Sequence, residues 1–248
     1  GFVSPDNYLS NDEQTEIVLN GVYHQLDFGG SSHPYQKAYP YYLDAATDDV
    51  FNRSPWEGMT IFARGQATPT SMRVGWKWNR NYQGISRANV LLDAIERADY
   101  ESVKSERYSA EAKFLRAWYY NDLVTYFGDV PLILEPGDLD NAQPARDAKN
   151  VVVEQIIKDL NEAITDLPEK YEEPKNNGRV TKGAALAFKA RVLLYNSKWS
   201  EAATAAKECI NLGVYTLYPD YYGLFQESNE EQASASEVIF QVYYTPER

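Results

Sequence analysis

The sequence has 248 residues, of which 44% are hydrophobic, and its formal net charge at pH 7 is −12. This length and composition argue for a globular chain with a sizeable buried core and against wholesale disorder. The negative charge argues against nucleic acid as a partner, which needs a basic footprint, and against docking on anionic lipid. No run of 18 apolar residues occurs, so no membrane-spanning helix is expected.

The first predicted helix begins at Ser10 and runs to about Phe28, where two glycines follow. Ser10 and Glu13 have the spacing of a capping box, in which the serine serves the orphan amides and the glutamate reaches back. Residues 31–73 come next and contain four prolines, so no long helix fits there. We expect this range to be an aromatic loop insertion.

The second predicted helix spans roughly 74–97, and its apolar stripe has spacings of 4, 3, 4, 3 and 3. The members of the stripe are Trp78, Tyr82, Ile85, Asn89, Leu92 and Ile95. Asn89 is the polar member. We expect a buried amide that ties two helices together, with a ligand contact as the alternative.

The third predicted helix carries two apolar stripes and ends on Gly-Asp-Val-Pro. One stripe is Ala112, Leu115, Tyr119, Leu123 and Tyr126, and the second is Phe114 and Trp118. Two stripes indicate a helix covered from more than one side, so its aromatic side chains are expected to be core rather than a binding platform. Gly128 can close the helix in the left-handed conformation, and Pro131 prevents it from resuming.

Residues 108–212 predict two helix hairpins, the first with a long insertion in its connection. Ile156, Leu160, Ala163 and Pro168 have the spacing of packing positions in a tetratricopeptide repeat. Further helices are expected from near Thr181 and from near Trp199. Such hairpins stack into a solenoid, because none buries its apolar face alone. The predicted fold class is therefore mostly α, a tetratricopeptide-like helix-hairpin scaffold with long irregular loops and little strand.

The end of the chain has a different pattern. A tyrosine-rich loop follows Gly213, and "SEVIFQVYYTPER" alternates like a β-strand. The single cysteine, Cys209, lies in a helical pattern without an activating neighbour, so we expect a packed core residue rather than a catalytic thiol.

Six blocks in order resemble the SusD/RagB-like family of Bacteroidetes outer-membrane nutrient-binding lipoproteins. They are "LNGVYHQL", "WNRNYQGISRANVLLDAI", "AEAKFLRAWYYNDLVTYFGDVPLILEP", "VVVEQIIKDLNEAITDLP", "GRVTKGAALAFKARVLLYNSKWSEAATAAKECINLG" and "SEVIFQVYY". The resemblance spans nearly all of 1–248 but only about the front half of a family member. The C-terminal half, which supplies part of the ligand site in the family, is therefore expected to be absent from this chain.

The resemblance implies a function that composition does not show. Family members are surface-exposed at the outer membrane, held by a lipidated cysteine that this chain would carry only in a longer precursor. They capture glycans, or in some cases peptides, for import through a SusC-like TonB-dependent transporter, and they are not enzymes. A tetratricopeptide-type protein- or peptide-binding adaptor is the alternative.

No convincing catalytic set is found, and neither a cofactor nor a metal is expected. Asp48, Asp49 and Glu57 could supply paired carboxylates for glycoside hydrolysis, but adjacent aspartates in a loop are more often turn formers. His24 and His33 show no metal-ligand spacing.

The region from 39 to 76 is the predicted ligand site. Aromatic plates can stack on the apolar face of a sugar ring while Asp, Asn and Arg side chains hydrogen-bond its hydroxyls, and loops on a rigid scaffold are a usual place for this. The alternative is that these aromatics pin a long loop to the helices. The candidate residues, with Trp56 first, are Trp56, Trp76, Tyr41, Tyr39, Asn52, Arg73 and Asp49. Trp78 is assigned to the core because it lies roughly 200° around the helix from Trp76.

Overall fold

The computed structural model describes residues 9–26, 44, 46–50, 60–98, 102, 104–137, 144–173, 176–229 and 236–242. Within these ranges the chain forms seven α-helices, short 3-10 turns and no β-strand. The helices are α1 (Asp12–Tyr23), α3 (Thr60–Ala63), α4 (Met72–Glu96), α5 (Ser105–Phe127), α6 (Lys149–Asp166), α7 (Lys182–Tyr195) and α8 (Trp199–Asn211). The 3-10 turns are η2 (His24–Leu26), η7 (Gly223–Phe225) and η8 (Glu227–Asn229).

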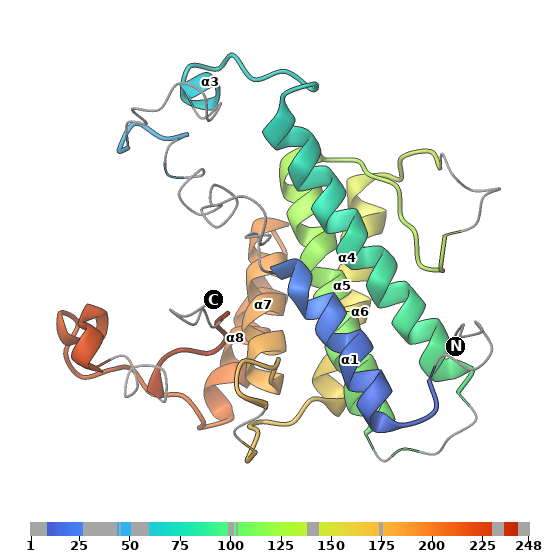
Figure 1. Cartoon of the computed structure of the whole chain (residues 1–248). Helices are drawn as coiled ribbons and strands as arrows, with labels where there is room; N and C mark the ends of the chain where they lie inside the picture. Colours follow the sequence, from blue (N-terminus) through green and yellow to red (C-terminus); the bar gives the residue numbers. More distant parts are fainter. Residues whose placement is uncertain are drawn as a thin grey trace.

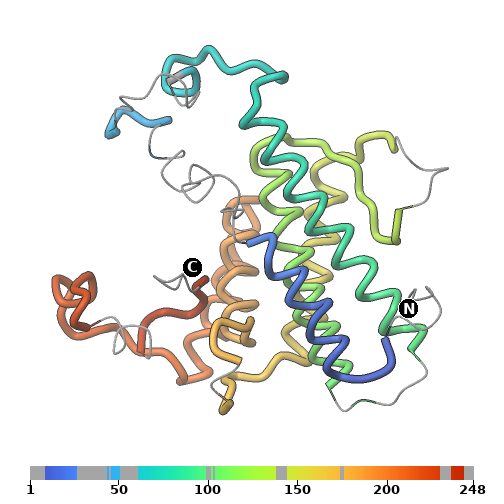
Figure 2. The backbone as a smooth tube through the Cα atoms, in the orientation of Figure 1, coloured from blue at the N-terminus to red at the C-terminus, as the bar shows by residue number. Residues whose placement is uncertain are grey.

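The long helices stack in the order in which they follow one another (Figure 1). α5 packs between α4 and α6, α7 packs on α6, and α8 packs on α7. The shorter α1 crosses α4 and α5, as the tube in Figure 2 also shows. The predicted hairpins are therefore confirmed as α5–α6 and α7–α8, and the fold is the mostly helical, tetratricopeptide-like scaffold expected from the spacing.

α4 and α5 approach each other closely because a glycine lies at their crossing. Gly84 is buried on α4, and a Cβ atom added to it would lie 2.5 Å from the ring of Tyr119 on α5. The Tyr119 hydroxyl donates a hydrogen bond to the Val22 carbonyl oxygen at 2.7 Å, so α1 holds the ring in place. The absence of a side chain at position 84 thus sets the distance between two helices of the scaffold.

The aromatic side chains of α5 belong to the core, as predicted. Phe114 is 1% exposed, and its ring centroid lies 5.6 Å from that of Phe188 on α7 and 5.7 Å from that of Phe240. Trp118 stacks on Phe188 at 4.7 Å. The prediction is wrong at Tyr126, which is 50% exposed near the end of the helix and contacts the ammonium group of Lys77 on α4, 4.1 Å from the ring centre, rather than an apolar core.

Each residue of the Gly-Asp-Val-Pro sequence after α5 has a structural role. Gly128 has φ 72° and ends the helix. Asp129 accepts a hydrogen bond at 2.8 Å from the backbone amide of Lys149, the first residue of α6. Val130 forms an antiparallel bridge with Asp147. The Pro131 carbonyl oxygen accepts a hydrogen bond from the Tyr82 hydroxyl at 2.8 Å. The sequence therefore closes one helix, caps the next and attaches the connection to α4.

The start of α1 differs by one residue from the prediction. Asn11, not Ser10, is the N-cap, and its side chain accepts a hydrogen bond from the Gln14 amide at 2.9 Å. The Gln14 side chain reaches back to the Ser10 amide, also at 2.9 Å. Two overlapping pairs have the capping spacing, and asparagine is as good an N-cap as serine, so spacing alone did not decide between them.

The expected strand near the end of the chain does not form in its described part, 236–242. The Thr216 amide donates to the Ser236 carbonyl oxygen at 2.9 Å, and no ladder continues from this bond within the described residues. Ile239 and Phe240 instead pack against the helical core.

Cys209 is 8% exposed on α8 and its thiol contacts the Gly183 carbonyl oxygen at 3.5 Å, as expected of a packed cysteine.

We predict that Gly84→Ala destabilises the protein by about 1–3 kcal/mol, because the new methyl group must displace the ring of Tyr119. Gly75→Ala in the same helix is the matched control. A Cβ at position 75 meets nothing within 4 Å. That variant should be neutral or more stable by up to about 1 kcal/mol, because alanine is the better helix former. Urea unfolding measures both, and equal effects would contradict the close approach.

Candidate functional site

Two predicted site residues, Arg73 and Trp76, lie together in the first turns of α4. The Arg73 guanidinium carbon lies 4.5 Å from the centre of the Trp76 ring. Trp76 is half-buried. Trp78 packs on the other side of the helix against Phe127, at 5.1 Å between ring centres, as predicted. The flat ring of Trp76 and the adjacent cation are thus presented at one end of a long, well-packed helix.

The other predicted site residues have fewer described side-chain contacts. Asp49 is exposed, and its backbone amide donates a hydrogen bond to the Thr47 hydroxyl at 3.3 Å. Thr47 in turn donates to the Asp44 carbonyl oxygen, which is the arrangement of a turn. The remaining four candidates, Tyr39, Tyr41, Asn52 and Trp56, lie outside the described residues. The site at 39–76 and the loop insertion at 31–73 therefore stay predictions.

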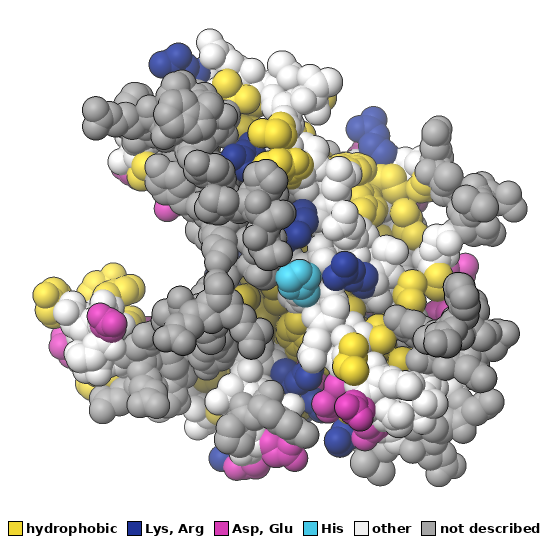
Figure 3. Space-filling model, viewed as in Figure 1, with side chains coloured by type: hydrophobic (Ala, Val, Ile, Leu, Met, Phe, Trp, Pro, Cys, Tyr) yellow, Lys and Arg dark blue, Asp and Glu magenta, His cyan; other side chains and the backbone are white. Residues whose placement is uncertain are grey.

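The carboxylates and histidines considered for catalysis or metal binding are exposed wherever the structure describes them. His24 and Asp48 are both exposed, and Figure 3 shows a histidine side chain at the surface. His33 and Glu57 lie outside the described residues. No group of three or more His, Cys, Asp or Glu side chains in the described part of the chain could hold a metal ion. Burial raises the pKa of the Cys209 thiol, which opposes thiolate formation. Within the same ranges, every helix is too short or too polar to cross a bilayer.

A fully buried carboxylate, Glu111 of α5, receives hydrogen bonds from three parts of the chain. The Tyr23 hydroxyl at the end of α1 donates to it at 2.6 Å, and Arg107 of α5 donates at 3.0 Å. Tyr171 and Arg179, from the connection between α6 and α7, donate at 3.2 and 3.1 Å. α1, α5 and this connection therefore meet at one side chain.

The electrostatics of this cluster follow from its burial. Burial raises the pKa of Glu111, and the neighbouring Arg179, Tyr23 and Arg107 oppose that rise. Burial also raises the pKa of Tyr23, and the adjacent carboxylate raises it further. The Tyr23 hydroxyl therefore stays protonated and donates to Glu111, while it accepts a hydrogen bond from the Val180 amide at 2.9 Å.

A second buried ion pair joins α5 to α6. Arg116 donates to both carboxylate oxygens of Asp159, at 2.7 and 2.8 Å. It also donates to the Asn89 side-chain oxygen on α4 at 2.9 Å. The Asn89 amide nitrogen donates to the carbonyl oxygens of Ile133 and Glu135. The prediction that Asn89 is a buried amide that ties helices together is thus confirmed.

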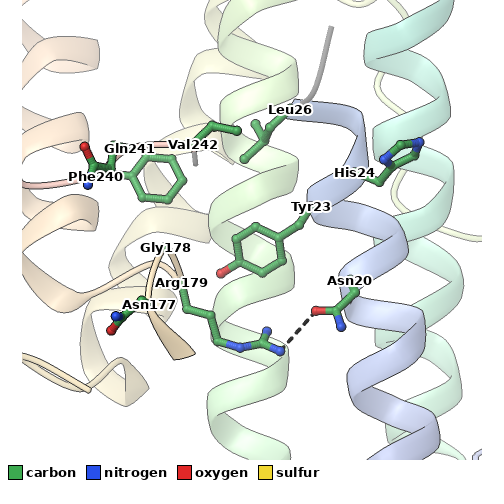
Figure 4. A pocket seen from close by; sticks show the side chains of 10 residues that line it. All are labelled: Asn20, Tyr23, His24, Leu26, Asn177, Gly178, Arg179, Phe240, Gln241 and Val242. Atoms are coloured by element: carbon green, nitrogen blue, oxygen red, sulfur yellow. Dashed lines mark hydrogen bonds between the residues drawn. The ribbon is translucent and has the colours of Figure 1, made fainter. Parts of the chain in front are cut away.

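A pocket of about 380 Å³ opens beside the Glu111 cluster (Figure 4). It lies between the end of α1 with η2, the loop 177–179 and the segment 240–242. Its lining is Asn20, Tyr23, His24, Leu26, Asn177, Gly178, Arg179, Phe240, Gln241 and Val242. Sequence reasoning missed this site because its walls come from three segments far apart in the chain, none with a recognisable motif.

A larger hollow of about 1,010 Å³ lies between α4, α5 and the residues 132–137 and 144–147. Its most buried polar side chains are Asn89 and Arg116. Asn89 donates to a carbonyl oxygen after α5, and Arg116 pairs with Asp159. These groups therefore hold the scaffold together rather than offer binding capacity to a ligand.

Comparisons with known proteins identify the family. A SusD-like family model, described as "Starch-binding associating with outer membrane", matches residues 3–194. The chain belongs to the SusD-like family. The resemblance seen in the six sequence blocks is thereby confirmed.

Curated relatives and solved structures agree with this assignment. The starch-binding protein SusD of Bacteroides thetaiotaomicron is 30% identical over 182 residues, which cover 69% of this chain and 31% of that protein. A SusD-like protein of Bacteroides ovatus is 28% identical over 94% of this chain and 44% of its own length. A solved laminarin-binding SusD-like protein superposes with a TM-score of 0.81 at 31% identity, over 91% of this chain and 50% of that one.

A solved SusD-like carbohydrate-binding protein from Bacteroides fragilis gives a TM-score of 0.81 at 26% identity, over 95% of this chain and 47% of that one. The chain spans less than half the length of the curated relatives named here and about half of the solved structures.

We predict that Tyr23→Phe costs about 1–3 kcal/mol of stability, because Glu111 loses a donor and the Val180 amide loses its acceptor in a buried site. Tyr126→Phe is the matched control. Its ring is half exposed. The control should cost no more than about 0.5 kcal/mol. Urea unfolding of both variants checks this, and a Tyr23→Phe variant as stable as the control would contradict the role of the hydroxyl.

Proposed function

We propose that this chain is the front portion of a SusD-like lipoprotein that captures oligosaccharides without catalysis. The match over 3–194 to a family described as starch-binding supports the ligand class, as do a starch-binding relative and a laminarin-binding neighbour. In this proposal the protein is surface-exposed at the outer membrane and hands the glycan to a SusC-like TonB-dependent transporter.

The observation that carries the proposal is the pairing of Trp76 with Arg73 at the start of α4. The ring offers an apolar plate for one face of a sugar ring, and the guanidinium beside it offers hydrogen-bond donors to the hydroxyls at its rim. Arg73 ends the segment 31–73, in which the other predicted aromatic residues lie, and Trp76 follows three residues later. α4 packs against α5 and α1, so this plate sits on a helix of the scaffold.

Calorimetric titration of the full-length protein tests the ligand class. The panel contains malto-oligosaccharides and laminari-oligosaccharides, with a set of peptides alongside. We expect at least one oligosaccharide to bind and to remain chemically intact afterwards. Binding of peptides but of no glycan would overturn the proposed substrate, and released cleavage products would overturn the absence of catalysis.

Replacement of single tryptophans tests the site. Trp76→Ala should weaken oligosaccharide binding about tenfold, which corresponds to roughly 1.4 kcal/mol. Trp56→Ala should abolish binding while the protein stays folded. Trp199→Ala is the control, since Trp199 is 63% exposed on the distant α8. Affinity unchanged in the first two variants, or weakened equally in all three, would reject the site at 39–76.

An adaptor function is the second candidate, and the outer face of α8 favours it. Trp199, Ala203, Ala206 and Ile210 recur at spacings of 4, 3 and 4 beside the buried stripe of this helix. Trp199 is 63% and Ile210 69% exposed. Such a stripe fits the apolar face of another helix. In-cell crosslinking of the full-length protein separates the two functions: transfer to the transporter favours glycan capture, and transfer to a soluble protein favours the adaptor.

A further inference from the structure

The pocket beside the Glu111 cluster is distinct from the pair at the start of α4, since neither Arg73 nor Trp76 lines it. Asp49, the third predicted site residue that the structure describes, does not line it either. Its volume of about 380 Å³ lies at the small end of the range for ligand pockets, roughly 300–1,000 Å³. Three elements hold its walls: α1 with η2, the loop before α7, and the segment 240–242. The pocket therefore has room for a small ligand or for the end of a longer one.

The apolar part of the lining is held rigidly. The ring of Phe240 is fixed by Phe114 and Trp118, at 5.7 and 6.1 Å between ring centres. The ring of Tyr23 is fixed through its hydroxyl, which contacts Glu111 and the Val180 amide. Two aromatic rings in fixed positions offer flat apolar surfaces at little cost in side-chain entropy.

The polar part of the lining carries little unbalanced charge. The guanidinium of Arg179 lies 3.1 Å from the Glu111 carboxylate, which offsets its charge. Arg107, which also pairs with Glu111, is balanced by Glu16 at 3.4 Å. The Arg179 contacts with Glu111, Asn20 and Asn176 use three of its five N–H groups. None of the described lining residues is Asp or Glu. An anionic ligand would meet the buried carboxylate behind the guanidinium as well as the guanidinium itself, so a neutral ligand with hydroxyl groups fits better.

We propose that this pocket binds a neutral sugar residue, as a second and smaller carbohydrate site beside α1. The rings of Tyr23 and Phe240 contact the apolar face of the sugar. The remaining Arg179 donors and the side-chain amides of the rim hydrogen-bond its hydroxyls. This site goes beyond the proposed function, because its ligand is a single sugar ring and its residues are distinct from those at the start of α4.

Saturation-transfer NMR on the full-length protein tests the proposal with D-glucose, D-galactose and D-glucuronate as probes. We expect a signal for at least one of the neutral sugars and a weaker one for glucuronate. Val242→Trp should abolish the neutral-sugar signal, because Val242 lies at the rim and a larger side chain fills the pocket. Val151→Trp on α6 is the matched control, since the two valines are 39% and 42% exposed, and it should leave the signal unchanged.

Phe240→Leu provides an independent check, because it keeps apolar packing but removes the flat ring; it should weaken the signal. The proposal would be overturned if Val242→Trp and Phe240→Leu leave the signals unaffected. It would also be overturned if no neutral sugar gives a signal, or if glucuronate gives a stronger one. Trp76→Ala separates the two sites. This variant should leave the monosaccharide signal intact while it weakens oligosaccharide binding. If no oligosaccharide in the calorimetric panel binds, that result refutes the proposed function but not the monosaccharide site.

Discussion

The burial of one carboxylate, Glu111, is the constraint on which the arrangement of the scaffold depends. Taking a carboxylate out of water costs several kcal/mol, and only good hydrogen bonds to charged or polar donors offset that cost. Here the donors come from α1, from α5 itself and from the connection between α6 and α7. These segments cannot move apart without leaving a buried charge unpaired. The cluster therefore fixes the position of α1 against the hairpins, and with it the walls of the neighbouring pocket.

The same helix supplies the other ties of the scaffold. Arg116 of α5 reaches Asp159 of α6 and Asn89 of α4, and Asp122 of α5 pairs with Lys77 of α4 at 2.5 Å. The aromatic face of α5 packs on α7 between these polar contacts. α5 is thus the central element on which the other helices are ordered, and functional side chains can be presented from α4 and the loops without repacking the core.

Local patterns in the sequence were enough to predict the long helices, whereas the four-residue α3 was not predicted. Apolar spacings located α4 to α8, and Gly128 and Thr181 marked a helix end and a helix start. Most of the buried polar contacts between helices could not be predicted from the sequence. Asn89 was visible because it interrupts an apolar stripe, whereas Glu111 looks like an ordinary surface residue of a helix. Its partners Tyr23 and Arg179 lie 88 and 68 residues away along the chain, a separation that periodicity does not report.

The same limit explains the candidate sites. Arg73 and Trp76 are close in sequence, so their pairing follows from helical spacing. The pocket beside α1 is assembled from three distant segments and has no local signature. The expected strand does not form in its described part, 236–242, for a related reason. The adjacent Ile239 and Phe240 both pack on the helices, whereas successive side chains of a strand point to opposite faces, and the described residues give the segment no neighbouring strand.

A double-mutant cycle between Glu111 and Arg179 tests the central claim most directly. Glu111→Gln, Arg179→Met and the double variant are compared by urea unfolding of the full-length protein. If the buried carboxylate joins the segments, each single change deprives the other group of a charged partner in the buried site. The two side chains should then show a coupling energy of about 2 kcal/mol or more. Effects that add within about 0.5 kcal/mol would contradict the account.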